Sequence, residues 1–447
     1  MQKELPQSLS LLDATMINIG SMIGSGIFIV PASVALYLDS SLLIIAVWIF
    51  GGIISLCGAL SIAELGAMMP KAGGQYVYLS KAYHPLFGFL YGWTNFAVIM
   101  TGSIAAVAVG FATYFGHFVS LNPIEIKTVA MLSVLFLTVV NCLSTKSGAL
   151  FQNAFTLIKM LCLGGLIVLP VILNGGSLAN FSPVFSHLPF SELIAPLGLS
   201  IVAVLWAYDG WIEITYVAGE VIEPQKNLPR ALIVSTLIVI ALYTLINFSY
   251  IYVLSLAGMS KAPMVASEAA VILFGAGGAS LVAIAVMIAM FGANNGFIFT
   301  GARIYYAMSK ERLFFRSIKH VHPTFDTPYI SLIAQGTWAC ALIFTGTFEQ
   351  LFTYVVFASW LFYAMSCGAV LILRKKSPDM VRIYRTWGYP WTPAAFILFS
   401  LFLVINTLIE DPRDALIGLG IILTGIPLYW YWSKTALTQP AEEPSIE

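Results

Sequence analysis

Long apolar stretches recur along the whole chain, and short polar, Pro-rich or Gly-rich interruptions separate them. A helix that crosses the hydrocarbon core of a bilayer needs about 20 mostly apolar residues. Twelve stretches come close to this length, and we expect each to form a transmembrane helix. Their approximate ranges are 13–38, 42–69, 86–118, 125–143, 149–173, 190–219, 229–257, 278–309, 328–346, 349–374, 390–409 and 412–433. The pattern predicts an all-α polytopic membrane protein with 12 transmembrane helices.

Two of these stretches contain residues that an uninterrupted helix rarely uses near its middle. The first places Gly20, Gly24 and Gly26 around two serines, and glycine costs about 1 kcal/mol relative to alanine in a helix interior. The sixth places Asp209 and Gly210 halfway along an apolar run, where an acid facing lipid costs about 3 kcal/mol. The glycines also fit a close helix–helix contact, and Asp209 also fits a cap on a second half-helix. We expect both helices to be broken, because such a cap itself requires a break.

The two broken helices are five helices apart, which is the spacing of two inverted repeats of five helices. The chain 1–447 would then be a single domain with a first repeat over 13–173, a second over 190–374, two more helices over 390–433 and a tail over 434–447. Exposed backbone in mid-membrane is tolerated only where it lines a cavity. There a zwitterion would find amides at Gly24, Ser25 and Gly26 for its carboxylate, and freed carbonyls of the sixth helix for its ammonium.

Composition and charge support this membrane assignment. Hydrophobic residues make up 59% of the chain and charged residues 9%, against roughly 25% charged residues in a typical globular protein. The 21 basic and 21 acidic residues cancel, so net charge gives no reason to expect nucleic acid as a partner. With the N-terminus inside, 17 of the 21 Lys and Arg residues are cytoplasmic, and only Lys127, Lys261 and Arg413 lie outside. The positive-inside rule therefore predicts that both termini are cytoplasmic.

The sequence shows no constellation that an enzyme or a metal site would need. The five cysteines lie in or beside apolar stretches without metal-ligand spacing, and we expect them to be free. There is no HExxH or GxSxG motif, and the histidines do not cluster as metal ligands. We therefore expect no catalytic residues, no metal and no cofactor.

Four motifs, in this order along the chain, resemble the amino acid–polyamine–organocation superfamily and, within it, the L-type amino acid transporter family. They are IGSGIF at 23–28, ELGAMMPKAGGQYVYL at 64–79, WAYDGW at 206–211 with GEVIEPQKNLPRAL at 219–232, and FGANNGFIFTGARIYYAMSKE at 291–311. The resemblance covers nearly all of the first ten helices. It implies a LeuT-type five-plus-five inverted repeat, with an L-amino acid bound between helices 1 and 6.

The resemblance also implies which residues bind the substrate. They are Met22, Ile23, Gly24, Ser25, Gly26, Trp206, Ala207, Tyr208 and Asp209. By this similarity the amides of Ser25 and Gly26, with Gly24, would hold the carboxylate, and carbonyls near Met22, Trp206 and Asp209 would hold the ammonium. Trp206 stands where relatives have an aromatic gate over the bound substrate, and its alternative role is an apolar anchor in a bundle rich in aromatic residues.

Lys159 is the one basic residue that the charge count assigns to neither side of the membrane, and it lies about ten residues into helix 5. A snorkelling lysine would lie nearer to an interface. The resemblance implies that its ammonium takes the place of a sodium ion and links helix 5 to helices 1 and 8. Lys159 would then couple substrate occupancy to rearrangement, in transport independent of sodium, and a proton role is also open. Ala289 and Met290 stand where relatives often have a hydroxyl residue, so the partner of Lys159 on helix 8 is left open.

Other polar residues are candidates for the transport pathway. Glu213 lies four residues beyond Asp209, on the same face of the expected half-helix. It could attract a cationic side chain or carry a proton, and we favour a third role, lining a solvated inner vestibule. Asn295 and Tyr354 are further pathway candidates, and Thr94, Ser103 and Asn294 are additional polar residues that could line it.

The resemblance, which is to bacterial exchangers of serine and threonine or of neutral amino acids, implies exchange of small or medium neutral L-amino acids across the cytoplasmic membrane by alternating access. The alternatives are a proton-coupled amino acid symporter, an exchanger of cationic amino acids or polyamines, and a sensor that binds without transport. We expect amino acids and the lipid bilayer as partners. Animal members join a heavy chain through a cysteine between helices 3 and 4, where this chain has none. We therefore expect no disulfide-linked heavy chain, and a monomer or weak homo-oligomer.

Overall fold

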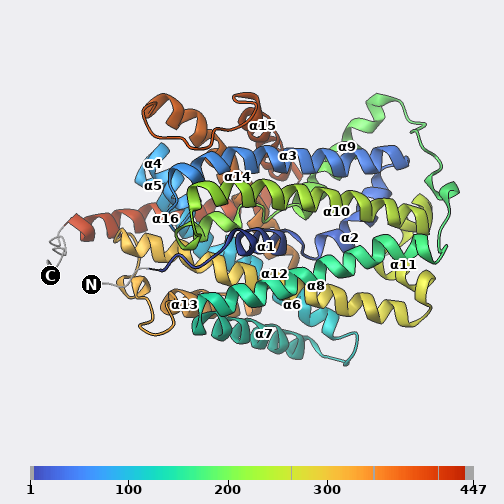
Figure 1. The fold of residues 1–447 in the computed structure, drawn as a ribbon, viewed down its shortest axis with the longest axis horizontal. Coiled ribbons are helices and arrows are strands. Elements are labelled where there is room, and N and C mark those ends of the chain that lie inside the picture. Colours follow the sequence, from blue (N-terminus) through green and yellow to red (C-terminus); the bar gives the residue numbers. More distant parts are fainter. Residues whose placement is uncertain (1–4, 263, 346–347, 411, 438–447) are drawn as a thin grey trace.

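The computed structural model describes residues 5–262, 264–345, 348–410 and 412–437, and side chains in 345–354, 414 and 436–437 are outside this description. These residues form a bundle of helices that run mostly along its long axis (Figure 1). The helices are α1 Leu11–Met22, α2 Gly26–Tyr37, α3 Ser41–Met68, α4 Gln75–Ala82, α5 Pro85–Thr94, η1 Asn95–Ile99, α6 Met100–Phe115, α7 Pro123–Leu143, α8 Thr145–Ile172, η2 Leu178–Phe181, α9 Phe190–Ala207, η3 Glu213–Glu220, α10 Pro224–Lys261, α11 Val265–Phe274, α12 Gly277–Lys310, η4 Arg316–Lys319, α13 Tyr329–Thr345, α14 Phe348–Lys376, α15 Trp391–Glu410 and α16 Pro412–Leu437.

The predicted apolar stretches coincide with these helices. Within the described residues, ten helices are long and apolar enough to cross a membrane, and α1 with α2, bent by 44° at their junction, could form an eleventh span. The stretch 328–346 corresponds to α13, a shorter apolar helix. The short helices α4 and α11 were not predicted. The all-α class of the prediction is confirmed.

Local sequence explains where several helices begin. The Ser10 hydroxyl accepts a hydrogen bond from the Asp13 amide, and the Asp13 carboxylate accepts one from the Ser10 amide, which is a capping box at the start of α1. Asn122 and Glu125 form the same arrangement at the start of α7. Caps of this kind satisfy amides that have no acceptor within the helix. They define helix starts that the apolar pattern alone leaves uncertain by a few residues.

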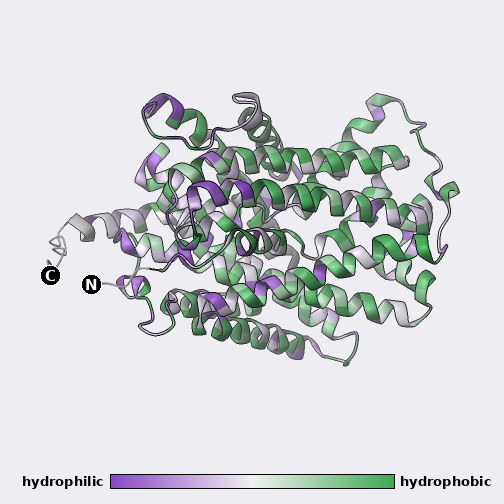
Figure 2. Ribbon diagram, in the orientation of Figure 1, coloured by the Kyte–Doolittle hydropathy of each residue, from purple (hydrophilic) through white to green (hydrophobic). Residues whose placement is uncertain are grey.

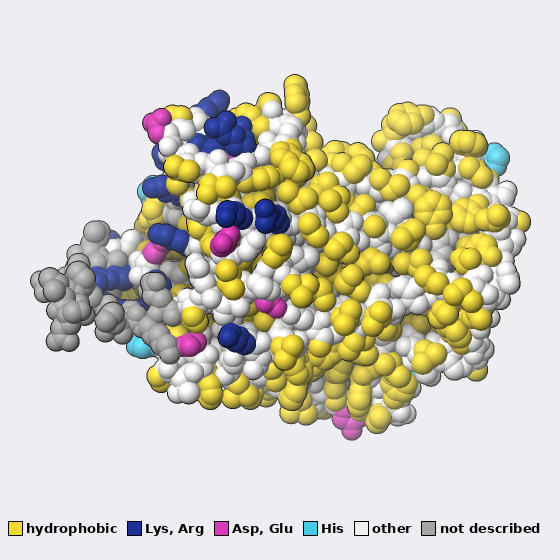
Figure 3. All heavy atoms as spheres, in the orientation of Figure 1, with side chains coloured by type: hydrophobic (Ala, Val, Ile, Leu, Met, Phe, Trp, Pro, Cys, Tyr) yellow, Lys and Arg dark blue, Asp and Glu magenta, His cyan; other side chains and the backbone are white. Residues whose placement is uncertain are grey.

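Polar and charged residues gather at one end of the bundle, the end at which the described chain starts and finishes. Figure 2 shows the hydrophilic residues concentrated there, and in Figure 3 the Lys and Arg side chains lie over the same end. We call it the charged end and define it by two buried clusters. Arg303 Nε lies 2.7 Å from Glu220 Oε1, and both side chains are fully buried. Glu64 binds Arg374 through both carboxylate oxygens (2.9 and 2.6 Å) and lies 3.3 Å from Arg382.

Glu220 also ties the chain before α1 to the end of η3. The amides of Ser8 and Leu9 both donate to the Glu220 carbonyl (2.8 and 2.9 Å), and the Ile222 amide donates to the Leu9 carbonyl (2.8 Å). Leu9 and Val221 form an isolated parallel bridge. Because Leu9 and Val221 are fully buried, this contact closes the charged end between α1 and η3.

Candidate functional site

The first helical segment is broken where the sequence predicts. α1 ends at Met22 and α2 starts at Gly26, and we call the intervening residues 23–25 the first break. The Gly24 amide donates to the Met22 carbonyl (3.0 Å), a turn that replaces the regular helical bond. α2 has no side-chain cap at Ser25. Since first-turn amides lack acceptors within the helix, the amides at Ser25 and Gly26 are suited to an anionic group.

The second break, residues 208–212, separates α9 from η3. Gly210 has φ = +97°, and a Cβ at this position would lie 2.7 Å from the Ser21 carbonyl oxygen. Glycine is therefore required both by its backbone conformation and by the close approach of the two breaks. The segment after the break differs from the prediction, because it is a 3₁₀-helix of eight residues and not an α-helical half. The Asp209 carboxylate accepts a hydrogen bond from the neighbouring Gly210 amide (2.9 Å).

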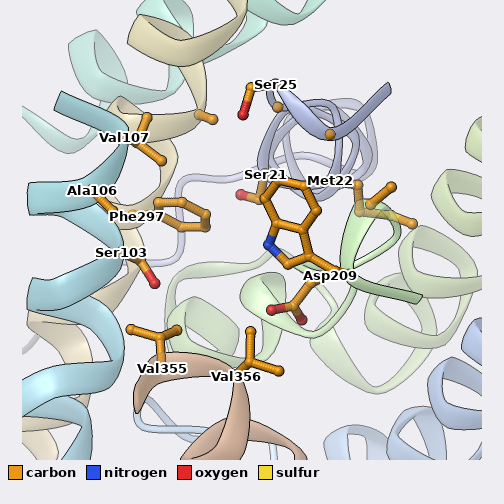
Figure 4. A pocket seen from close by; sticks show the side chains of 15 residues that line it. Ser21, Met22, Ser25, Ser103, Ala106, Val107, Asp209, Phe297, Val355 and Val356 are labelled. Atoms are coloured by element: carbon orange, nitrogen blue, oxygen red, sulfur yellow. The ribbon is translucent and has the colours of Figure 1, made fainter. Parts of the chain in front are cut away.

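A cavity of about 90 Å³ lies between the two breaks and helices α6, α12 and α14. In Figure 4, Ser103, Ala106 and Val107 form one wall, and Met22 and Asp209 lie across from them. The full set of lining residues is Ser21, Met22, Gly24, Ser25, Gly26, Ser103, Ala106, Val107, Trp206, Ala207, Asp209, Ala293, Phe297, Val355 and Val356. We call this the first cavity. Its polar groups belong mainly to the breaks, and its remaining walls are small or apolar.

Seven of the nine predicted substrate-binding residues line the first cavity: Met22, Gly24, Ser25, Gly26, Trp206, Ala207 and Asp209. The other two lie behind it. Ile23 is fully buried, and its carbonyl accepts a hydrogen bond from Lys159. Tyr208 is also buried, and its hydroxyl donates to the Trp48 carbonyl on α3 (3.1 Å).

Two carbonyls predicted to hold an ammonium group already accept hydrogen bonds within the protein. The Met22 carbonyl accepts from the Gly24 amide and from the Tyr243 hydroxyl (2.9 Å). The Trp206 carbonyl accepts from the Asp209 amide (3.0 Å). A carbonyl oxygen has two lone pairs, so the Met22 oxygen is filled in this state. Asp209 is then the acidic side chain among the residues that line the first cavity.

Lys159 lies behind the first break, 2% exposed, and joins α8 to α1. Its Nζ donates to the Gly20 carbonyl (2.7 Å) and to the Ile23 carbonyl (2.9 Å). The break frees these oxygens from their usual helical partners, so the Lys159 amine satisfies them. α12 meets Lys159 at Gly292, where an added Cβ would lie 2.9 Å from Lys159 Cε. α12 thus contacts Lys159 through close packing, because Gly292 leaves room for the lysine side chain.

A smaller cavity of about 30 Å³, the second cavity, adjoins the first. Asp209, Ser103 and Phe297 line both. Its other lining residues are Gln75, Tyr91, Asn95, Ile99, Met100, Gly210, Glu213, Tyr216, Ser359 and Tyr363. The Tyr363 hydroxyl donates to Asp209 (2.9 Å), and Thr300 on α12 forms a hydrogen bond with Glu213. Glu213 is 4% exposed, so it is buried among polar groups and does not line a solvated vestibule in this state.

The other pathway candidates have different surroundings. Asn295 is buried, donates to Gln152 (2.8 Å) and accepts from Asn141 (2.9 Å), and so belongs to a polar cluster between α7, α8 and α12. The side chain of Tyr354 lies outside the described residues. Thr94 donates to the Leu90 carbonyl of its own helix (2.7 Å). Asn294 is buried and lines neither cavity, whereas Ser103 lines both.

Several residues of the site were not singled out from the sequence. Phe297 and Thr300 lie within the FGANNGFIFTGAR motif, but the motif does not show which face of the helix meets the cavities. Tyr363 belongs to no motif that we recognised, and it becomes visible only as the partner of Asp209. Val355 and Val356 are ordinary apolar residues whose role follows from their position at the cavity wall.

Comparison with known proteins adds independent evidence. A family model described as amino acid permease matches residues 9–431. The serine/threonine exchanger SteT of Bacillus subtilis is 34% identical over 433 residues, covering 96% of this chain and 98% of that protein. The mouse b(0,+)-type amino acid transporter 1 is 32% identical over 436 residues, covering 95% and 88% of the two chains. The mouse large neutral amino acids transporter small subunit 2 is 33% identical over 443 residues, covering 96% and 82%.

Proposed function

The chain belongs to the amino acid permease family, and we propose that it exchanges small or medium neutral L-amino acids across the cytoplasmic membrane without sodium. The observation that carries this proposal is the meeting of two helix breaks at one small cavity. Amides of one break and a carboxylate of the other are the two kinds of group that a zwitterion requires. The short side chains of Ser103, Ala106 and Ala293 favour a small substrate side chain.

The substrate would bind with its carboxylate at the start of α2 and its ammonium toward the second break. The Ser25 and Gly26 amides, with Gly24, would hold the carboxylate. Asp209 would attract the ammonium, and its Oδ1 is already oriented by Tyr363 and Gly210. Trp206, which lines the first cavity, would cover the bound amino acid as a gate. The Bacillus relative is a serine/threonine exchanger, which agrees with a substrate of this size.

Independence of sodium is supported by Lys159. Its ammonium already occupies two carbonyls at the first break, where a bound cation would otherwise be needed to balance them. Because this cation is covalently part of α8, it stays with the protein through the cycle. Lys159 would thereby couple the state of the first break to α8 and α12.

For the arrangement in the membrane, we propose 12 spans with two inverted repeats of the LeuT type, over 13–173 and 190–374, followed by helices over 390–433. The α1–α2 pair and the α9–η3 pair would be equivalent broken helices. The Lys and Arg side chains at the charged end favour a cytoplasmic position for that end and for both termini. We propose that the chain works without a disulfide-linked heavy chain, as a monomer or weak homo-oligomer.

The test is a counterflow screen in proteoliposomes loaded with one amino acid, with each of the twenty L-amino acids offered outside. We expect accumulation of serine, threonine and other small neutral substrates, at equal rates in sodium and in choline buffer. Uptake that requires sodium would contradict the role of Lys159. Rapid uptake into empty vesicles driven by an inward proton gradient would replace exchange with symport. A preference for cationic amino acids or polyamines would contradict neutral selectivity, and binding without flux would indicate a sensor.

A further inference from the structure

Glu213 is buried beside the second cavity without a cationic partner. Within the part of the chain that the structure describes, no Lys, Arg or His forms an ion pair with Glu213 or Asp209. An ionised carboxylate that is removed from water and left without a counter-charge costs several kcal/mol. The surroundings of Glu213 therefore favour a neutral carboxyl group.

Titratable groups face Glu213 from each side, and all of them are acids or phenols. Asp209 and Tyr216 lie on the same segment, Tyr91 on α5, Tyr305 on α12 and Tyr363 on α14. The nearby segments of α1 and α4 contribute the neutral side chains Asn18 and Gln75. None of these groups supplies a positive charge.

The hydrogen bonds of Thr300 give a second, geometric indication. Its hydroxyl oxygen contacts both the Gly296 carbonyl oxygen (2.9 Å) and a carboxyl oxygen of Glu213. A hydroxyl has one hydrogen to donate. If this hydrogen goes to the Gly296 carbonyl, which cannot donate, the contact with Glu213 is a hydrogen bond only when Glu213 supplies the hydrogen. Both contacts are satisfied together by a protonated Glu213.

The second cavity offers a route for that proton. Its volume of about 30 Å³ exceeds the roughly 10–15 Å³ that one water needs. Ser359 is 2% exposed and lines the cavity, and its hydroxyl has no hydrogen-bond partner among the residues that the structure describes. An orphan hydroxyl and two carboxyl groups around one space are the partners that a bridging water requires. Because Asp209 also lines the first cavity, the route continues to the substrate site.

We propose that Glu213 is a proton-binding site and that the exchange cycle requires this proton, an inference that rests on the exchange function proposed above. The proton reaches Glu213 from the first cavity through Asp209 and a water in the second cavity. In the transfer, the water gives one proton to the Glu213 carboxylate as it receives one from the Asp209 carboxyl, so Glu213 becomes neutral and Asp209 becomes ionised. Asp209 is then negatively charged when the substrate ammonium arrives.

The first experiment measures the counterflow rate of purified protein in proteoliposomes between about pH 5.5 and pH 9, with equal pH on both sides. For a single required proton, the wild-type rate should fall about tenfold per pH unit above its midpoint. Glu213→Gln keeps the shape and the neutral state of the protonated acid, and its rate should stay constant within about twofold over the same range. A wild-type rate independent of pH, or a Glu213→Gln variant with the wild-type profile, would overturn the proposal.

A second variant tests the direction of the hydrogen bond. Thr300→Val removes the acceptor of the Glu213 proton, so the midpoint of the pH profile should move about one unit toward acid. A move toward alkaline pH would mean that Thr300 donates to an ionised Glu213, which contradicts the assignment. Thr236→Val is the matched control, because Thr236 is also buried and also donates to a carbonyl of its own helix, on α10 and outside both cavities. Its profile should match that of the wild type.

Infrared spectroscopy tests the proton without relying on transport. Purified wild-type protein near pH 7 should show the carbonyl stretch of a protonated carboxylic acid, and Glu213→Gln should lose that band. If the band is present and lost in this way while no exchange is detected, the proton site stands and the exchange function fails. If the band is absent from the wild type or persists in the variant, the proton site itself is wrong.

Discussion

Charged side chains have different kinds of partner at the charged end of the bundle and at the two breaks. At the charged end each buried acid meets a guanidinium group, Glu220 with Arg303 and Glu64 with Arg374. At the breaks, Lys159 is held by backbone carbonyls, Asp209 by a tyrosine hydroxyl and an amide, and Glu213 by a threonine hydroxyl. The first region pairs opposite charges, whereas the second surrounds single charges or potential charges with neutral dipoles.

This difference indicates that the charged groups at the charged end stabilise the fold, whereas those at the breaks serve transport. A buried ion pair is strongly destabilised when one partner is removed, because the other charge is left uncompensated. A hydrogen bond to a neutral group contributes about 1 kcal/mol net and can be replaced by water or substrate at a small cost. We therefore expect variants at the charged end to lose stability, and variants at the breaks to lose transport while they remain folded.

The largest effect should come from Arg303→Ala at the charged end. It leaves the fully buried Glu220 carboxylate without its cation, and we expect a loss of about 3–5 kcal/mol in the free energy of unfolding. The measurement is the thermal unfolding midpoint in detergent, together with the yield of monodisperse protein. Normal stability with impaired exchange would show that this pair acts in the cycle, and the contrast between the two regions would fail.

Lys159→Ala should have the next largest effect, on turnover. It leaves the Gly20 and Ile23 carbonyls without their donor, and we expect the exchange rate to fall about 10- to 100-fold, which corresponds to about 1.4–2.8 kcal/mol. Substrate affinity, measured by equilibrium binding, should change about threefold or less, because Lys159 does not line the first cavity. Lys127→Ala on α7 is the control, since Lys127 is partly exposed and donates to one carbonyl (3.1 Å). An unchanged exchange rate in Lys159→Ala would remove the proposed coupling role.

Gly292→Ala tests the contact between α12 and Lys159 without changing a charge. The new Cβ would lie 2.7 Å from Phe155 Cβ and 2.9 Å from Lys159 Cε, so one neighbour must move. Overpacking of this kind costs about 1–3 kcal/mol of stability. If Lys159 is the neighbour that moves, the exchange rate should fall, as expected for Lys159→Ala. Gly164→Ala on α8 has no atom within 4 Å of the added Cβ and should exchange normally. Equal rates in the two variants would show that α12 and Lys159 are not coupled by close packing.

The smallest effect is expected from Lys226→Ala. Lys226 and Glu223 form an ion pair (3.1 Å) whose side chains are 59% and 63% exposed. An exposed pair of this kind contributes about 0.5 kcal/mol or less, because solvent screens it. The unfolding midpoint of the variant should therefore lie within measurement error of the wild type. A loss of stability as large as that of Arg303→Ala would mean that burial does not determine how much an ion pair contributes to stability.

Much of the fold follows from the sequence, because apolar length and breaking residues are local properties. The apolar stretches coincide with helices, and both breaks lie where glycine and Asp209 interrupt the pattern. The free state of the five cysteines was also expected and is confirmed. The helices α4 and α11 were not predicted, because they are much shorter than a membrane span and the prediction relied on apolar stretches of that length.

The parts that the sequence does not reveal depend on packing between helices. The rotation of α12 brings Phe297 and Thr300 to the cavities and leaves Asn295 in a separate polar cluster. The second break is followed by a 3₁₀-helix, so the expected α-helical register between Asp209 and Glu213 does not apply. Lys159 meets α12 at Gly292, which belongs to the motif at 291–311, but the motif does not show that this glycine faces the lysine.

Glu220 links three segments of the chain at the charged end. Its carbonyl holds the strand-like residues before α1, its carboxylate holds Arg303 of α12, and its backbone ends η3. Three segments from distant parts of the sequence are thus fastened at a single joint. We therefore expect these three segments to move together when this end of the bundle opens.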